Sequence, residues 1–296
     1  MPPSGERIAL TSFVTCAVLA GGNAVCIRFS NRELAPFWGA GLRFSLAAAL
    51  LIGVMLVLRI EIPRGRALSG SALYGIFNFG GSFGFAYYAL VRLQAGFGQT
   101  VLALVPLATL LLAVAQRQER MRARAVVGAL LALGGVAVMS RAPLDQAVPP
   151  ASLLALLGGV FCFAEAAVLV RRLPRVHPVA MNAVGMVAGA ALLVAISLVV
   201  REPIELPDRR ATWVAIAYLV VLGSGAVFVL GIVVLRYWEA SRFSYLFVVI
   251  PPIAVLLSAW LDDEPIGAGL LAGGVLIVAG VYVGALRRAQ PQPAKC

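Results

Sequence analysis

Charged residues are scarce in this sequence. Asp, Glu, Lys and Arg together make up 12% of its 296 residues, whereas hydrophobic residues make up 61%. A soluble domain has about 25% charged and about 45–50% apolar residues. Together with a mean hydropathy of +0.95, this composition excludes an ordinary soluble domain and predicts an all-α integral membrane protein whose main partner is the lipid bilayer.

The side chains of common catalytic and metal sites are rare as well. His177 is the only histidine, so neither a histidine-based metal site nor a Ser-His-Asp relay is expected. The four cysteines form no Cys-x-x-Cys pair, and three lie in apolar runs where buried free thiols are expected. No Gly-x-x-x-x-Gly-Lys-[Ser/Thr] motif occurs. We therefore expect no enzyme, no cofactor, no metal and no ATP-driven transport by this chain alone.

The net charge of +11 would suit a nucleic-acid partner if the arginines formed one basic face. They lie instead in short connectors between apolar runs, where positive charge orients a membrane protein. The sequence thus argues against nucleic-acid binding.

An internal repeat divides the chain into two halves, which we expect at 1–145 and 146–296. Landmarks recur 145 positions apart: Ala95, Pro106, Glu119, Gly128 and Gly135 correspond to Ala240, Pro251, Glu264, Gly273 and Gly280.

Ten segments are long and apolar enough to cross a membrane: 8–28, 36–58, 68–91, 95–115, 124–140, 150–170, 178–200, 211–235, 241–261 and 266–286. The first is long for a signal-peptide core, so we expect it to be a retained span. Lys and Arg are more than twice as frequent on one side, which predicts that both termini are cytoplasmic. Five spans per half imply two inverted repeats, an arrangement typical of transporters with a central cavity.

Two charged residues, Arg43 and Glu165, lie well inside predicted spans. A charge there is costly, so it usually faces a cavity or a partner. For Glu165 two interpretations remain open: a site for a substrate ammonium or a proton, or a structural hydrogen bond. Arg43 is a charge partner or an anchor of the helix ends, and a direct Arg43–Glu165 ion pair is possible. Glu165 is the one good candidate for a proton carrier, but facilitated diffusion and exchange stay equally open.

Polar and aromatic residues form one face of the third span, because their spacings of three and four match a helical turn. They are Tyr74, Asn78, Ser82, Phe85 and Tyr88. We expect this face to point inward, either lining a cavity or forming interhelical hydrogen bonds. Gln99 and Tyr245 are further candidates on inner faces.

Pro106 and Pro251 lie inside the fourth and ninth spans at equivalent repeat positions. A proline within a helix removes a backbone hydrogen bond and bends the helix. The pair predicts either gating hinges or static kinks. Glycines four residues apart in the tenth span predict close packing, on the fifth span or on a second protomer.

In each half of the chain, short motifs follow one another in an order that resembles the EamA-type half of the drug/metabolite transporter superfamily. They are Tyr88-Ala89-Leu90, Gln94-Ala95-Gly96, Leu104-Val105-Pro106, Glu119 and Gly128 to Gly135, then Ala240-Ser241-Arg242, Ile250-Pro251, Glu264, Gly273 and Gly280. The resemblance, most of all to YddG-type amino-acid exporters, implies a ten-span exporter in the bacterial inner membrane. It implies a cavity lined by spans 1, 3, 4, 6, 8 and 9, and thereby favours Asn23, Asn78, Ser82, Gln99, Glu165, Ser224, Phe228 and Tyr245. Glu165 departs from the family's pattern.

The sequence thus predicts a secondary transporter that exports neutral or aromatic amino acids, or related small metabolites, by alternating access. A chain with both halves contains a complete pathway, so we expect a functional monomer. Multidrug or nucleotide-sugar transport is the nearest alternative, and a non-transporting membrane scaffold is a remote one. A nucleotide-sugar site would need several cations for phosphate, whereas only Arg43 is available.

Overall fold

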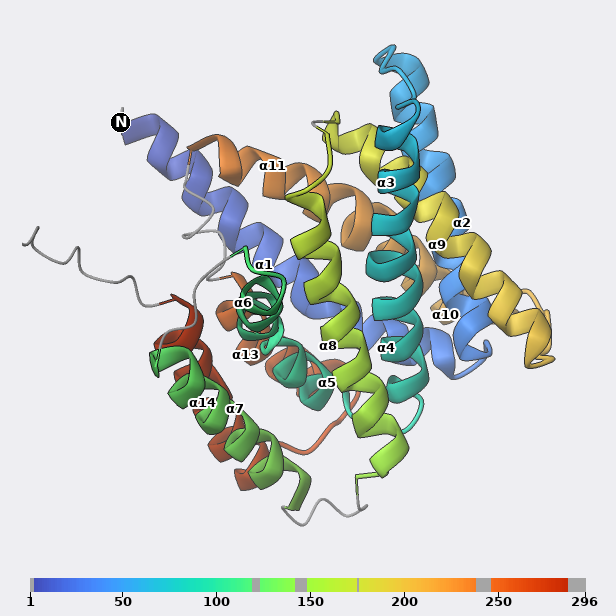
Figure 1. The fold of residues 1–296 in the computed structure, drawn as a ribbon. Coiled ribbons are helices and arrows are strands. Elements are labelled where there is room, and N and C mark those ends of the chain that lie inside the picture. Colours follow the sequence, from blue (N-terminus) through green and yellow to red (C-terminus); the bar gives the residue numbers. More distant parts are fainter. Residues whose placement is uncertain (1–2, 119–122, 142–147, 175, 238–245, 287–296) are drawn as a thin grey trace, which may run out of the picture.

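The computed structural model describes residues 3–118, 123–141, 148–174, 176–237 and 246–286. All regular structure in these ranges is helical (Figure 1), and it accounts for each of the ten expected spans. Single α-helices form the spans α1 (Pro3–Asn31), α2 (Pro36–Val57), α7 (Ala123–Arg141), α8 (Pro150–Val170), α9 (Pro178–Val199) and α13 (Leu246–Leu261). Five helical stretches are long and apolar enough to cross a membrane: Glu6–Asn31, Pro36–Val57, Ala95–Ala115, Pro150–Val170 and Pro178–Val199.

The other spans are composites of shorter pieces. The third consists of α3 (Arg66–Gly75), a π-helical segment η1 (Ile76–Ser82) and α4 (Phe83–Leu90); the fourth of α5 (Ala95–Leu102) and α6 (Val105–Ala115). The eighth consists of α10 (Arg210–Ala217), the π-helical η2 (Tyr218–Ala226) and α11 (Val227–Tyr237); the tenth of α14 (Ala268–Val281) and η3 (Tyr282–Leu286). The two π segments η1 and η2 occupy corresponding places in the two halves.

Local sequence explains where the uninterrupted helices begin and end. Pro36, Pro150 and Pro178 each stand in the first turn of a helix, where proline's fixed φ fits and its missing N–H is not needed. After α2 and α9 the chain turns through Arg59 and Arg201 at φ 52° and 57°. These left-handed residues let the backbone close the last helical turn. They lie 142 positions apart, so the two halves end their second spans in the same way.

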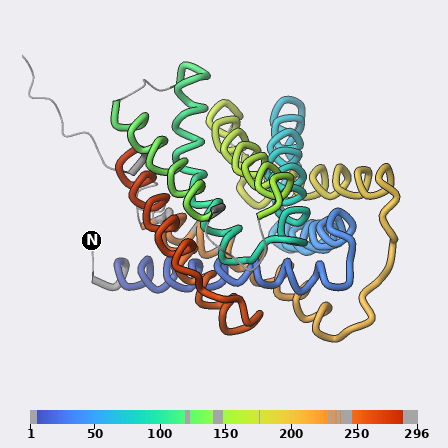
Figure 2. The backbone as a smooth tube through the Cα atoms, turned by 90° about the horizontal axis from the view of Figure 1, so that it is seen from below, coloured from blue at the N-terminus to red at the C-terminus, as the bar shows by residue number. Residues whose placement is uncertain are grey.

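Several helices pack against helices of the other half, and two of them pack against their own repeat counterparts. Helix α2 packs against α9, its own counterpart, and α7 packs against α14 in the same way. Helix α1 packs against α13, while its counterpart α8 packs against α5 and α6. Figures 1 and 2 both show α7 alongside α14. The expected packing of the tenth span on the fifth is therefore confirmed.

Counterpart helices run in opposite directions. Gly128 near the start of α7 faces Gly280 and Gly284 near the end of the tenth span, and Gly135 further along α7 faces Gly273. The start of α2 likewise lies beside the residues that follow α9, because Trp38 N–H donates to Glu202 Oε2 at 2.8 Å. The fold is therefore two inverted five-helix repeats, as the odd number of spans per half predicts.

We predict that Gly135→Ala weakens the α7–α14 contact. A Cβ at Gly135 would lie 2.6 Å from the carbonyl oxygen of Gly273, so two backbones must separate, at a cost of about 1–3 kcal/mol in the free energy of unfolding. Gly134→Ala on the next residue is the matched control, because its Cβ meets no atom within 4 Å and alanine favours the helix. Equilibrium unfolding in mixed micelles measures both, and equal stability of the two variants would contradict this packing.

Candidate functional site

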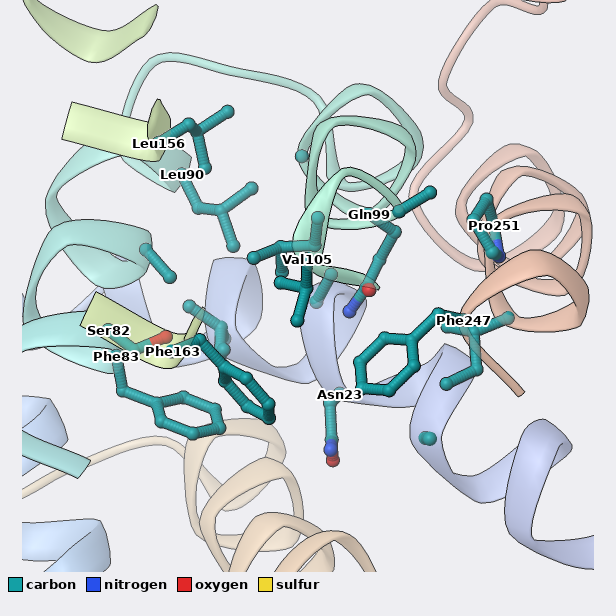
Figure 3. Close-up of a pocket in the computed structure, with 18 of the residues that line it drawn as sticks. Asn23, Ser82, Phe83, Leu90, Gln99, Val105, Leu156, Phe163, Phe247 and Pro251 are labelled. Atoms are coloured by element: carbon teal, nitrogen blue, oxygen red, sulfur yellow. The ribbon is translucent and has the colours of Figure 1, made fainter. Parts of the chain in front are cut away.

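A pocket of about 270 Å³ lies at the centre of the bundle, between the two halves. Its walls come from α1, η1, α4, α5, α6, α8, η2, α11 and α13 (Figure 3). Most of the wall is aliphatic or aromatic, including Phe83, Phe163 and Phe247. The polar side chains that line it are Asn23, Ser82 and Gln99. A concave, mostly apolar space with a few converging polar groups is typical of a small-molecule site.

The amides of the pocket are only partly satisfied. Gln99 directs its amide into the pocket, between the labelled Val105 and Phe247 (Figure 3). Asn23 Nδ2 donates to the carbonyl oxygen of Gly223 at a long 3.5 Å. Asn23 Oδ1 is buried and has no hydrogen-bond partner. The pocket therefore offers a solute at least one free acceptor and one orientable amide.

Glycine at position 223 makes room for this arrangement. A Cβ there would lie 2.1 Å from Asn23 Oδ1, so any side chain would displace the amide. Gly223 belongs to η2, in which Ser224 Oγ donates to the carbonyl oxygen of Leu219, five residues earlier, at 2.9 Å. The wider turn of a π-helix leaves backbone carbonyl oxygens without their usual α-helical donor, and a side-chain hydroxyl such as that of Ser224 can donate to them. Turns of this kind recur at functional sites.

The π-helical segment η1 also separates the polar residues of the third span, so that those before it and those after it face different neighbours. Ser82, at the end of η1, lines the pocket, whereas Tyr74 in α3 lies against α9 and its hydroxyl is 3.5 Å from Asn182 Oδ1. Asn78 is buried inside η1 and does not line the pocket. An extra residue per turn rotates the following side chains around the helix axis, so one continuous stripe faces two neighbours.

Glu165 lies in α8 outside the pocket, and its carboxylate oxygens accept hydrogen bonds from Gln116 Nε2 at 2.9 and 2.6 Å. Gln116 lies at the end of α6, and no motif in the sequence marks it as a partner of Glu165. Arg43 and Glu165 form no ion pair with each other in the described part of the chain. Phe228 belongs to α11, but its side chain is outside what the structure describes, and Tyr245 lies outside the described residues altogether.

The two repeat-related prolines differ in position. Helix α5 ends at Leu102, the residue whose carbonyl a non-proline at Pro106 would bond, and α6 begins at Val105. Pro106 thus accounts for a break in the fourth span. Pro251 stands inside the continuous helix α13, is buried, and lines the pocket. The break at Pro106 and the position of Pro251 both fall at the pocket wall, since Val105 and Pro251 contribute to it.

Arg43 in α2 is buried with 1% of its surface exposed. Its Nη2 donates to Ser224 Oγ at 3.4 Å, and its guanidinium carbon lies 4.8 Å from the ring centres of both Phe44 and Phe83. Its Nε and Nη1 have no hydrogen-bond partner. The ion pairs found in the described residues involve Arg28 and Arg32 instead.

The family to which these features belong is given by comparison with known proteins. The model of the EamA-like transporter family matches the chain twice, over residues 7–141 and 150–285. The chain belongs to the EamA-like transporter family. It is therefore a multi-pass membrane transporter of the drug/metabolite transporter superfamily and not an enzyme.

Individual relatives are distant but nearly full-length. A protein of Escherichia coli K12 described as an uncharacterized inner membrane transporter, YedA, is 25% identical over 90% of this chain and 87% of its own length. A probable amino-acid metabolite efflux pump of Salmonella typhimurium is 26% identical over 90% of this chain and 91% of its own length. A solved crystal structure superposes with a TM-score of 0.67 at 22% identity, covering 94% of this chain and 96% of that one; it supports the fold alone.

Charged side chains join the two EamA-like repeats at the end of the bundle that holds the α1–α2 connector. Arg28 pairs through Nε with Asp262 Oδ2 at 2.8 Å and through Nη1 with Glu264 Oε1 at 3.0 Å, and Arg32 also pairs with Asp262. Glu264 further accepts the N–H of Ala95 at 2.8 Å, at the start of α5.

Two more glutamates cross between the repeats in the same manner. Glu202 accepts the N–H groups of Phe37 and Trp38 at the start of α2, and Glu33 accepts the N–H groups of Asp208 and Arg209 just before α10. Each carboxylate satisfies donors that a helix start leaves free, and its charge is favourable there. Pairs of this kind position the pocket-bearing helices of one EamA-like repeat against the other.

We predict that Glu264→Gln lowers the free energy of unfolding by about 1–3 kcal/mol, because the half-buried Arg28 loses one of its two carboxylate partners and α5 loses a charged cap. Glu61→Gln is the control, since this glutamate is exposed and should change stability by less than about 0.5 kcal/mol. Equilibrium unfolding in mixed micelles gives both values. A Glu264→Gln variant as stable as the control would refute the stabilising role of this network.

Proposed function

We propose that this protein is a secondary transporter that exports neutral or aromatic amino acids, or closely related metabolites, across the inner membrane by alternating access. The observation that carries the proposal is the central, largely apolar pocket with Asn23, Ser82 and Gln99 in its wall, placed between two inverted repeats. Apolar walls suit an aliphatic or aromatic side chain, and the amides and hydroxyl suit the polar groups of an amino acid.

The size and charge of the pocket favour a small solute over the alternatives. Pockets for drug-sized ligands measure about 300–1,000 Å³, and this one measures about 270 Å³. No Lys or Arg is among its described lining residues, so the two phosphates of a nucleotide sugar would meet no cation. The relative from Salmonella typhimurium, a probable amino-acid metabolite efflux pump, points in the same direction.

In this proposal both termini are cytoplasmic and the chain acts as a monomer. Solute enters the pocket from the cytoplasm, and the two repeats rock about the bends in the fourth and ninth spans. The cross-repeat network around Arg28 and Glu264 holds the α1–α2 end together in the structure. It would have to open in the complementary state, because alternating access exposes the site to one side at a time.

Counterflow in proteoliposomes with labelled phenylalanine and leucine tests the function. We expect exchange in the wild type and about tenfold weaker apparent binding in Gln99→Leu, because one hydrogen bond to solute is lost. Thr109→Val is the matched control: its hydroxyl donates to the carbonyl oxygen of Val105 within α6, and it does not line the pocket. Folded wild-type protein that exchanges no amino acid would overturn the proposal.

The hinge role of Pro251 has its own test. Replacing both Pro251 and the adjacent Pro252 by alanine restores two helical donors in α13, so the exchange rate should fall about fivefold while the affinity for solute stays within about twofold. Pro178→Ala, at the start of α9 and away from the pocket, should leave both unchanged. Rate and affinity come from counterflow and from ligand-induced thermal shifts. An unchanged exchange rate in the double variant would mean that the prolines of α13 do not act as a hinge.

A further inference from the structure

The buried guanidinium of Arg43 has a full charge and incomplete hydrogen bonding. Its Nε and Nη1 are unpartnered, and the contact from Nη2 to Ser224 Oγ is long, at 3.4 Å. The hydroxyl of Tyr87, wholly buried beside it, interacts with the guanidinium but supplies no counter-charge. No carboxylate of the described residues pairs with Arg43. A cation left in this condition lacks the anion that would complete it.

This cation lies directly behind the wall of the central pocket. Phe83 belongs to both environments: it lines the pocket, and its ring stacks on the guanidinium at 4.8 Å. Ser224, the partner of Nη2, follows Gly223, which also lines the pocket. The free acceptor Asn23 Oδ1 lies against Gly223. Figure 3 places Phe83 and Asn23 in the lower wall of the pocket.

The free groups on the two sides of Phe83 complement a zwitterion. Nη2 of an arginine shares one edge with Nε and another with Nη1, and each edge presents parallel N–H groups that match a carboxylate. Asn23 Oδ1 is an acceptor suited to an ammonium group. The Phe83 ring covers the guanidinium face and also lines the pocket, so a carboxylate that comes from the pocket must pass this ring to reach an edge of the guanidinium.

We propose that Arg43 binds the carboxylate of the transported solute, and that the Phe83 ring moves aside to admit it. This inference rests on the proposed function and narrows it: the solute class is small carboxylates whose amino group, when present, meets Asn23. The proposal also explains how a pocket with no cation among its described lining residues could bind amino acids, because Arg43 lies behind Phe83, a lining residue.

The test compares phenylalanine with phenylalaninamide, and acetate with acetamide, by thermal shift and counterflow on the full-length protein. Wild type should bind each carboxylate at least about tenfold more tightly than its amide, as one charge-assisted hydrogen bond requires. Arg43→Gln should reduce this ratio to within about twofold, and Arg43→Lys, which keeps the charge but loses the fork, should restore only part of it.

Phe83→Ala keeps the proposal testable if Arg43 variants fail to fold. Without the ring, the carboxylate reaches the guanidinium freely, so the carboxylate-to-amide ratio should rise. Phe163→Ala is the matched control, because this phenylalanine lines the same pocket without stacking on Arg43, and it should weaken both ligands alike. Equal effects of the two phenylalanine variants on the ratio would overturn the role of Phe83.

The outcomes separate this inference from the proposed function. Amino-acid exchange that keeps its carboxylate preference in folded Arg43→Gln refutes only the role of Arg43. Preference for acetate but no exchange of any amino acid refutes the proposed function and leaves the carboxylate site standing. Stabilisation by chloride alone, with no preference for either carboxylate, would show an inorganic-anion site and overturn the proposal.

Discussion

The hydrocarbon core of a membrane contains no water to bond with the backbone, so each peptide group must find its partner inside the protein. The fold follows from this constraint: all regular structure in the described spans is helical. The spans depart from the α-helix at η1, η2 and η3, and the fourth span breaks at residues 103–104. Three of these departures border the central pocket, η1 through Ser82, η2 through Gly223 and the break through Ala103. The π-helical η3 at the end of the tenth span does not line it, so the interruptions gather at the pocket without being confined to it.

Inversion of the repeats determines how the two halves meet. Because α2 and α9, and likewise α7 and α14, are counterparts running in opposite directions, the start of one helix lies beside the end of its mate. Glutamates in the connectors can then reach across to free N–H groups, as Glu202 does at α2 and Glu264 at α5. Close glycine contacts hold α7 and α14 together along their length. Among the described residues, these two pairs contribute none to the pocket wall, and they flank the helices that line it.

The sequence predicted the ten spans, the two halves and the break at Pro106, and it gave packing of the tenth span on the fifth as one of two alternatives, because each depends on composition or on a strong local rule. Pro251 stands inside a continuous helix, so the bend expected there stays a prediction. It did not predict the π-helical segments, since an α-turn and a π-turn differ by one hydrogen-bond register and leave nearly the same apolar pattern. That omission is why Tyr74, Asn78 and Ser82 were expected on one face, whereas Ser82 alone reaches the pocket. The Gln116–Glu165 contact was equally inaccessible, because it joins spans from different halves.

Burial of the Arg43 charge is unfavourable by itself, and its aromatic contacts show how the fold tolerates it. A charge at mid-membrane costs about 2.5–3.5 kcal/mol on insertion scales, and a cation–π contact recovers about 0.5–2 kcal/mol. Two such contacts, with Phe44 and Phe83, offset much of the cost but leave donors unpaired. A fixed carboxylate would satisfy those donors permanently and remove any reason for an external anion to bind. An incompletely compensated cation is stable enough to fold, and it retains binding energy for an anion that arrives through the pocket.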